Sequence, residues 1–171
     1  MSDITKVLRD DHARIKRLFL RANQSSEDLD IALDVCDELI IHATIEDEVF
    51  YPALAELNKG MADDAEDDHE AAKELIAEIE DLDPDDPAVR TMMMQLQKSV
   101  MRHFEKEEKV LFPVLEKGYP DTLLEMGSEA FKIRQELLGA RPPRRKTIGT
   151  QTANVGWAAK RRTSNTSNMG F

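Results

Sequence analysis

All four histidines of the chain stand in a pattern that can hold metal. His42 is followed four residues later by Glu46, and His103 is followed four residues later by Glu107. On a helix, residues four apart lie one above the other, so each imidazole and its carboxylate can reach one point. One further histidine precedes each pair, which completes a candidate ligand set of His12, His42, Glu46, His69, His103 and Glu107.

These six side chains offer nitrogen and oxygen donors and no thiolate. Imidazole suits Zn, Cu, Fe and Ni, while carboxylates that bridge two cations suit Fe or Mn. Two histidines per iron, two bridging glutamates and one solvent-derived oxygen bridge would give each of two iron ions five ligands. Each iron would then keep an open position, where dioxygen, nitric oxide or peroxide binds.

The pattern occurs twice along the chain. Residues 42–52 align with residues 103–113 without gaps, and in both copies a proline stands ten residues after the histidine. Upstream, the segment Arg-Asp-Asp-His12 matches Glu-Asp-Asp-His69. Two equivalent helix pairs related by a pseudo-twofold would bring the two half-sites together in the centre of a bundle.

The spacing of the apolar residues predicts an all-α fold. The predicted helices cover about residues 3–22, residues 29 to near 52, residues 61–81, residues 87–114 and, as a shorter fifth helix, residues 120–138. Each histidine lies on the apolar face of one of the first four helices. Short connections between long helices favour an antiparallel, up-down-up-down four-helix bundle.

The charge divides the chain into two parts. The net charge of the 171 residues is -11, but residues 141–171 contain seven Lys and Arg and no Asp or Glu, which leaves about -18 for the first 140. We therefore expect one helical domain over residues 1–140 and a disordered basic tail over residues 141–171. Such a tail could contact nucleic acid, an acidic partner or anionic lipid through its positive charge, or it could be an inert solubilising extension.

The sequence also indicates a cytoplasmic protein. The N-terminal segment MSDITKVLRDDH carries charges where a signal peptide needs an apolar run, and no stretch approaches the roughly 18 apolar residues of a membrane span. The single cysteine, Cys36, excludes an internal disulfide.

On these residues the chain resembles the hemerythrin-like, or HHE cation-binding, domain family. The resemblance covers about residues 3–138: the opening Val-Leu-Arg-Asp-Asp-His12, both His-x-x-x-Glu copies with their proline endings, and the spacing between helices. It implies an antiparallel four-helix bundle around a non-haem diiron centre. The ligands it implies are His12, His42, Glu46, His69, His103 and Glu107.

The chain departs from the dioxygen-carrying hemerythrins in one respect. Those proteins use five histidines to saturate one iron and leave the other open, and this chain has four. The difference argues against reversible oxygen carriage. Tyr51 or Tyr119 could replace the missing histidine, but Tyr51 lies off the apolar helix face at regular helical spacing.

Other residues beside the ligands allow two interpretations. Asp11 and Asp68 either orient the ligands or face solvent, and solvent exposure is the simpler expectation. Glu48 and Glu108 point about 100° or more away from the ligands on helix geometry, which predicts solvent exposure or an outer contact.

Rival ligand patterns fit less well. Ferritin-like bundles use Glu-x-x-His, and only His69, with Glu66, has that spacing. The His-Glu-x-x-His motif of zinc proteases is absent.

Three functions are left open. The first is a diiron protein that binds or senses dioxygen, nitric oxide or iron. The second is a catalase-like enzyme that decomposes peroxide at the diiron centre, which requires an acid or base beside the open metal position. The third is a structural or interaction protein that holds zinc or manganese in the same cage. The sequence leaves the oligomeric state undetermined.

Overall fold

The computed structural model describes residues 2–24, 29–83 and 86–140, and the predicted tail lies outside these ranges. Within the described ranges the chain forms helices and no strand, which confirms the all-α prediction. In chain order, the elements are α1 (Ile4–Gln24), α2 (Leu29–Ile45), the π-helical turn η1 (Glu46–Phe50), α3 (Tyr51–Leu57), α4 (Lys59–Asp81), α5 (Ala88–Lys106), the π-helical turn η2 (Glu107–Leu111), α6 (Phe112–Gly118) and α7 (Leu123–Ala140). No described helix is long and apolar enough to cross a membrane.

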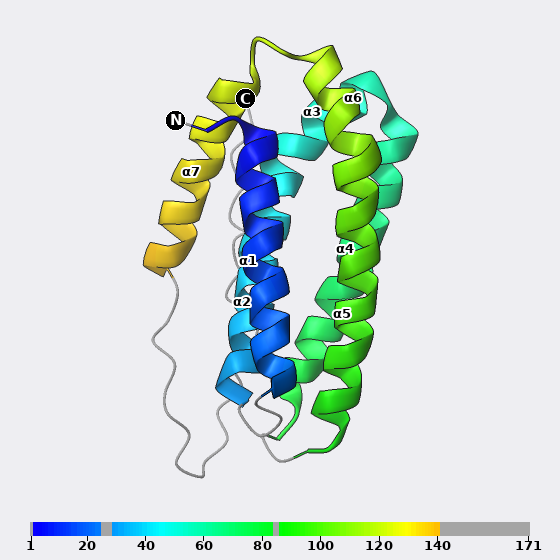
Figure 1. The fold of residues 1–171 in the computed structure, drawn as a ribbon, viewed down its shortest axis with the longest axis vertical. Coiled ribbons are helices and arrows are strands. Elements are labelled where there is room, and N and C mark those ends of the chain that lie inside the picture. The colour runs from blue at the N-terminus through cyan, green and yellow to red at the C-terminus, as the bar shows by residue number, and fades with distance from the viewer. Residues whose placement is uncertain (1, 25–28, 84–85, 141–171) are drawn as a thin grey trace, which may run out of the picture.

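The long helices form the predicted antiparallel bundle (Figure 1). α1 packs against α2 and α4 packs against α5, while contacts of α2 with α4 and of α1 with α5 close the ring. α7 lies outside this ring and packs on α1 and α2. Gly127 of α7 permits a close approach, because a β-carbon there would lie 2.0 Å from the Ser2 carbonyl oxygen.

The helix that carries Glu46 does not end near Pro52, as the sequence had suggested. It widens into η1, where the Tyr51 N–H donates to the Glu46 carbonyl oxygen five residues earlier, and then continues as α3 to Leu57. Proline has no N–H, so Pro52 cannot continue the α-helical bonding of the turn before it. The wider π turn absorbs this mismatch, and Pro52 then occupies the first turn of α3, where an N–H is not needed.

The second half repeats this construction. η2 begins at Glu107, the Phe112 N–H donates to the Glu107 carbonyl oxygen, and Pro113 stands in the first turn of α6. Both predicted ligand glutamates are therefore the first residue of a π turn. Such turns often mark functional sites in proteins.

Side-chain hydrogen bonds lie at the starts of two other helices. The Asn58 side chain accepts a hydrogen bond from the Met61 N–H at 3.1 Å, and α4 starts two residues before its predicted start. Asp86 accepts a hydrogen bond from the Ala88 N–H at 2.8 Å. α5 begins at Ala88, one residue after the predicted start at Pro87.

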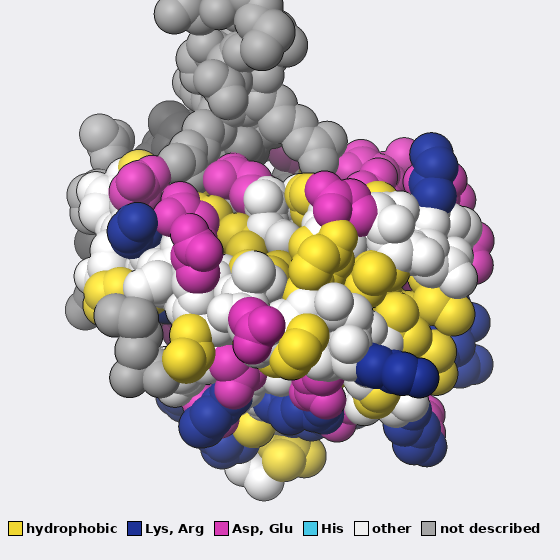
Figure 2. All heavy atoms as spheres, turned by 90° about the horizontal axis from the view of Figure 1, so that it is seen from above, with side chains coloured by type: hydrophobic (Ala, Val, Ile, Leu, Met, Phe, Trp, Pro, Cys, Tyr) yellow, Lys and Arg dark blue, Asp and Glu magenta, His cyan; other side chains and the backbone are white. Residues whose placement is uncertain are grey.

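The core consists of two apolar clusters along the bundle. One lies toward α3, α6 and α7 and contains Leu8, and the other lies toward the opposite end and contains Ile15. His12 lies between them on α1, so a polar layer separates the two clusters. At the end of the bundle seen in Figure 2, hydrophobic side chains are exposed among acidic ones.

Candidate metal centre

The structure brings all six predicted ligand side chains into one buried layer. The α-helices supply the histidines and the π turns supply the glutamates, and none of the six is more than 6% exposed. The layer consists of His12 on α1, His42 on α2, His69 on α4, His103 on α5, Glu46 at the start of η1 and Glu107 at the start of η2.

The donor atoms gather in two groups that share Glu46. Within each group, one donor atom per residue lies within 4.8 Å of the others. The first position contains His12, His42, Glu46 and Glu107, and the second position contains His69, His103 and Glu46.

Both glutamate side chains lie between the two positions. One oxygen of Glu46 lies 3.1 Å from His42 Nε2 and 3.2 Å from His69 Nε2. The two oxygens of Glu107 divide between the positions, with Oε2 3.3 Å from His12 Nε2 and Oε1 3.4 Å from His103 Nε2. Carboxylates placed in this way can bridge two cations.

Several of these inward-facing atoms lie close to one another but form no hydrogen bond with the part of the chain that the structure describes. They are His12 Nε2, His42 Nε2, both carboxylate oxygens of Glu46 and Oε2 of Glu107. Burial of unpaired polar and charged groups costs several kcal/mol, so a protein that buries them together needs a compensating charge. Two divalent cations would supply it, and the mixed imidazole and carboxylate donors fit Fe, Mn or Zn.

On its outer side, each imidazole faces a further carboxylate. For His12, His69 and His103 this contact is a hydrogen bond that orients the ring so that Nε2 points into the layer, whereas His42 lies only at ion-pair distance from its carboxylate. The nitrogen–oxygen distances are 2.8 Å for His12 Nδ1–Glu108, 3.6 Å for His42 Nδ1–Asp11, 2.9 Å for His69 Nδ1–Asp47 and 3.4 Å for His103 Nδ1–Asp68.

These outer contacts correct the expectation that Asp11 and Asp68 face solvent. Asp11 is buried, and Asp68 is only about one-third exposed at 31%. Solvent exposure and an outer contact were the two alternatives predicted for Glu108, and it makes the outer contact, with His12. Asp47 was not singled out from the sequence, although the repeat contains the signal, because Asp47 follows Glu46 as Glu108 follows Glu107.

The carboxylates dominate the electrostatics of the histidines. Burial opposes protonation of His42, but Glu46 and Asp11 outweigh burial and raise its pKa to about 10. Burial likewise opposes protonation of His103, while Glu107 and Asp68 raise its pKa to about 10. Burial also opposes ionisation of Asp47, yet its hydrogen bond with His69 holds its pKa at about 2.

Tyr51 also enters the layer, contrary to its predicted orientation. Its side chain is fully buried, and its hydroxyl donates to Glu107 Oε1 at 2.8 Å. The hydroxyl oxygen lies 3.1 Å from His69 Nε2 and 3.2 Å from His103 Nε2. Burial and the nearby Glu46 and Glu107 raise the pKa of Tyr51 well above its usual value, so the free phenol stays neutral.

The helical spacing explains why the sequence pointed Tyr51 elsewhere. Five residues of α-helix turn Tyr51 about 140° from Glu46. The π turn places it nearly over Glu46 instead. Tyr119 does not reach the layer, because its hydroxyl donates to Glu56 at the surface.

The helix outside the ring contacts the layer through Arg134. Arg134 of α7 donates to Asp11, and it also lies 3.3 Å from Glu38 of α2. Arg14 bonds the same two carboxylates, at 2.5 Å and 3.0 Å. Asp11 contacts both Arg134 of α7 and His42, and it thus connects α7 to the layer.

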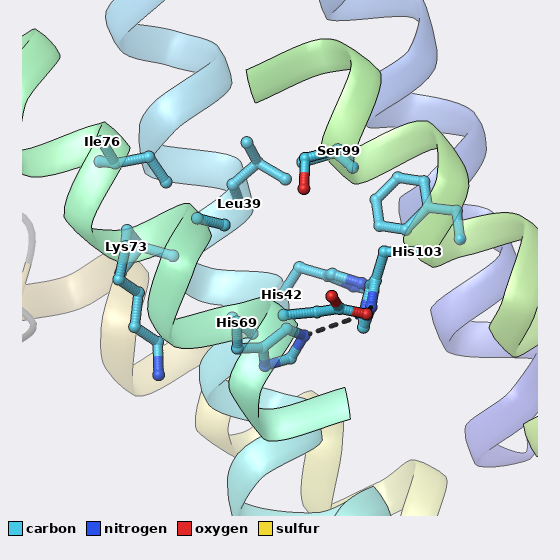
Figure 3. A pocket seen from close by; sticks show the side chains of 13 residues that line it. Leu39, His42, His69, Lys73, Ile76, Ser99 and His103 are labelled. Atoms are coloured by element: carbon cyan, nitrogen blue, oxygen red, sulfur yellow. Dashed lines mark hydrogen bonds and ion pairs between the residues drawn. The ribbon is translucent and has the colours of Figure 1, made fainter. Parts of the chain in front are cut away.

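A small pocket borders both histidines of the second position and His42 of the first (Figure 3). Its cavity volume is about 20 Å³, which is room for about one water-sized molecule. In Figure 3, Leu39, Ile76 and Ser99 lie across the cavity from the labelled histidines. Its lining is Leu39, Ile40, His42, Ala43, Asp68, His69, Ala72, Lys73, Ile76, Ser99, Val100, His103 and Phe104.

Comparison with known families agrees with this geometry. Residues 3–115 match the hemerythrin HHE cation-binding domain, which is more than half of the chain. The chain belongs to the hemerythrin HHE cation-binding domain family. A second match of this HHE domain, over residues 67–129, begins two residues before His69, within the second copy of the repeat.

Two known proteins are similar to this HHE domain. A solved structure of a hemerythrin HHE cation-binding domain-containing protein from Mycobacterium kansasii superposes with a TM-score of 0.65 at 21% identity, over 81% of this chain and 91% of that one. A protein named DNA nickase from Nostoc sp. is 26% identical over 158 residues, 90% of this chain and 43% of the relative. The chain therefore spans less than half the length of that relative.

Proposed function

We propose that this HHE domain is a non-haem diiron protein that binds or senses a small uncharged molecule, with dioxygen and nitric oxide as candidates. The six buried side chains His12, His42, Glu46, His69, His103 and Glu107 would hold the two irons. Membership of the cation-binding family and the clustered donors support metal binding. Two ions at adjacent positions, and iron as their identity, are our proposal.

One observation carries this proposal. Both glutamate carboxylates lie between two histidine pairs, and both have buried oxygens that form no hydrogen bond with the described residues. Two cations side by side would satisfy these oxygens together, whereas a single cation at one position would leave one pair of histidines without a metal. Carboxylates that bridge cations favour iron or manganese.

The chain's own residues would prepare the site in three ways. The outer carboxylates hold each imidazole with Nε2 facing inward. The bundle excludes bulk water from the layer, because its six ligands are almost fully buried. The pocket beside His69 leaves room for one small molecule. Bound iron would supply an open coordination position and reversible electron transfer.

The first experiment measures metal and optical spectrum together. The protein is purified from iron-replete cells, its metal is counted by elemental analysis, and spectra are recorded with dithionite, oxygen and nitric oxide. About two irons per chain, with absorption that responds to one of the gases, is the expected result. Zinc or manganese alone would support the structural cage instead.

The ligand assignment is tested by His42→Ala and Glu46→Ala. Both changes should lower the metal content and remove the thermal stabilisation that metal provides, which is about 2.7 kcal/mol at a metal concentration of 100 times Kd. Glu48→Ala, an exposed residue of the same π turn, is the matched control and should keep its metal. Unchanged iron in both ligand variants would exclude the assignment.

Tyr51 supports a second candidate function, the decomposition of peroxide. Conversion of two hydrogen peroxide molecules to two waters and one dioxygen needs a proton donor and acceptor at the metal, and the buried Tyr51 hydroxyl lies against both histidines of the second position. Iron-loaded protein should then consume peroxide faster than free iron, and Tyr51→Phe should slow it. Turnover equal to that of free iron would rule this candidate out.

A further inference from the structure

The repeat relates the two histidine pairs, yet their surroundings differ. On the first position, the Phe104 ring stacks on the His12 imidazole, with ring centroids 3.7 Å apart and an interplanar angle of 12°. Phe104 directly follows His103, and the matching residue after His42 is Ala43. Beside His69, which corresponds to His12, the chain therefore offers a methyl group in place of an aromatic ring.

At two further pairs of equivalent positions, the side chain near His69 is again smaller than the one near His12. Ala72 and Ile76 line the pocket three and seven residues after His69. The residues at the same distances after His12 are Ile15 and Phe19, and each is larger than its counterpart. Ile15 and Phe19 are at most 1% exposed, as is Phe104, so they fill the space on the His12 side. The smaller side chains on the other side leave the pocket.

The size and lining of the pocket define what can occupy it. A volume of about 20 Å³ holds one water-sized molecule, and Leu39, Ala43, Ala72 and Val100 make the walls largely apolar. The charge of Lys73 at the margin is already paired with Asp47 at 2.8 Å and with Glu70 at 2.9 Å. A hydrated anion would lose its water without gaining partners there. An uncharged diatomic molecule would lose little hydration free energy on entering the pocket.

We propose that Ala43 keeps this pocket open as the route by which an uncharged diatomic molecule, nitric oxide or dioxygen, reaches the metal held by His69 and His103. Phe104, which borders the same pocket, stacks on His12 and fills the matching space beside that imidazole. The two metal positions would therefore differ in access, because the pocket borders both histidines of the second position but only His42 of the first. This inference rests on the proposed function, because the metal is the target of the ligand.

The test is a series of substitutions that fills the pocket in steps. Ala43→Val, Ala43→Leu and Ala43→Phe add volume, and Ala43→Ser is the control that adds almost none. Each protein is loaded with ferrous iron, its metal is counted, and nitric oxide association is followed by stopped-flow absorbance. We expect association to slow progressively, by about tenfold at Ala43→Leu, with the metal count unchanged.

A reciprocal variant tests the role of Phe104. The double change Ala43→Phe with Phe104→Leu closes one route and opens the other, so it should recover fast association with a different ferrous-nitrosyl spectrum. If Ala43→Phe fails to fold, the Val and Leu variants still decide the question. Azide, a small anion, should bind the wild-type protein more slowly than nitric oxide, and faster binding of azide would overturn the ligand class.

The outcomes separate this inference from the proposed function. A wild-type protein that holds no iron pair, or does not respond to nitric oxide, contradicts the proposed function itself. A wild-type protein that binds nitric oxide at a rate unchanged throughout the Ala43 series overturns only the route. A rate that falls equally in Ala43→Ser overturns it as well, because that change does not fill the pocket.

Discussion

At the scale of single residues, the site depends on which nitrogen of each histidine faces inward. An imidazole has two ring nitrogens, and a carboxylate near one of them favours a proton there and leaves the other for a metal. Every histidine of this chain has such a carboxylate near Nδ1. The four rings are thereby oriented before any metal binds, which lowers the conformational cost of binding.

Tyr51 provides the residue-scale prediction. Its hydroxyl lies in the second position and is the candidate for the ligand that a fifth histidine would otherwise supply. In the ferrous protein the neutral phenol donates to Glu107 and would leave the coordination position open. A ferric ion would favour the ionised phenol instead, so ferric wild-type protein should show visible phenolate-to-iron absorption. Tyr51→Phe should remove this absorption and retain the metal. It should also cost the metal-free protein about 1 kcal/mol, because one buried hydrogen bond is lost.

The measurements for Tyr51→Phe are elemental analysis, visible spectra and urea unfolding. Tyr119→Phe is the control, because that hydroxyl bonds Glu56 at the surface, away from the layer. If the absorption persists in Tyr51→Phe, or is absent from the wild type, Tyr51 is only a hydrogen-bond donor to Glu107.

At the scale of elements, the π turns and α7 bring side chains to the site that four straight α-helices would not place there. η1 and η2 start at the ligand glutamates and shift the helical register by one residue. The shift moves Tyr51 into the layer in one half and Phe112 toward His12 in the other, with the rings of Phe112 and His12 5.6 Å apart. The same backbone device thus places a polar ring at one metal position and an apolar ring at the other.

Arg134 provides the element-scale prediction. It is the residue through which α7 contacts Asp11, which in turn faces His42. Arg134→Gln should destabilise the metal-free protein by about 2 kcal/mol, because it removes one charged hydrogen bond to buried Asp11 while Arg14 remains as a partner. Metal affinity should fall by about tenfold, because Asp11 no longer holds His42 in place.

Urea unfolding of the metal-free protein and metal competition with a chelator measure these two effects. Lys132→Gln, an exposed residue of the same helix that pairs with Glu129, is the matched control and should change stability by about 0.5 kcal/mol or less. A loss of stability in Arg134→Gln at unchanged metal affinity would make α7 a structural clamp with no influence on the site.

At the scale of the whole molecule, the chain is a duplicated helix pair whose halves have diverged around a shared layer. The halves agree in the ligands and in the carboxylates beside them. They differ in the side chains packed next to the rings, where Ala43 and Phe104 occupy equivalent positions. A symmetric scaffold thus holds two groups of candidate ligands with unequal surroundings.

The tail provides the whole-molecule prediction. The described bundle contains the whole candidate site, so deletion of residues 141–171 should leave helicity and metal content unchanged. We propose that the seven basic residues of the tail bind a polyanion such as nucleic acid, an attraction that salt weakens. Circular dichroism, elemental analysis and DNA binding at two salt concentrations test both statements. A truncated protein that loses helicity or metal would show that the tail packs on the bundle.

The sequence by itself determined the helical class, the order of the helices, the repeat and the six candidate ligands. These follow from periodicity and spacing, because a helix places His42 and Glu46 on one face whatever surrounds it. Their burial in one layer follows from the same apolar faces, and the structure brings all six together.

Only the tertiary structure decided what completes the site. Tyr51 enters the layer because a π turn shifts its register, and local periodicity assumes 3.6 residues per turn. Asp11 is buried because Arg134, more than a hundred residues away, supplies its counter-charge. The pocket exists because Ala43, Ala72 and Ile76 meet from two different helices. Such contacts between distant segments depend on how the helices pack, which no local pattern specifies.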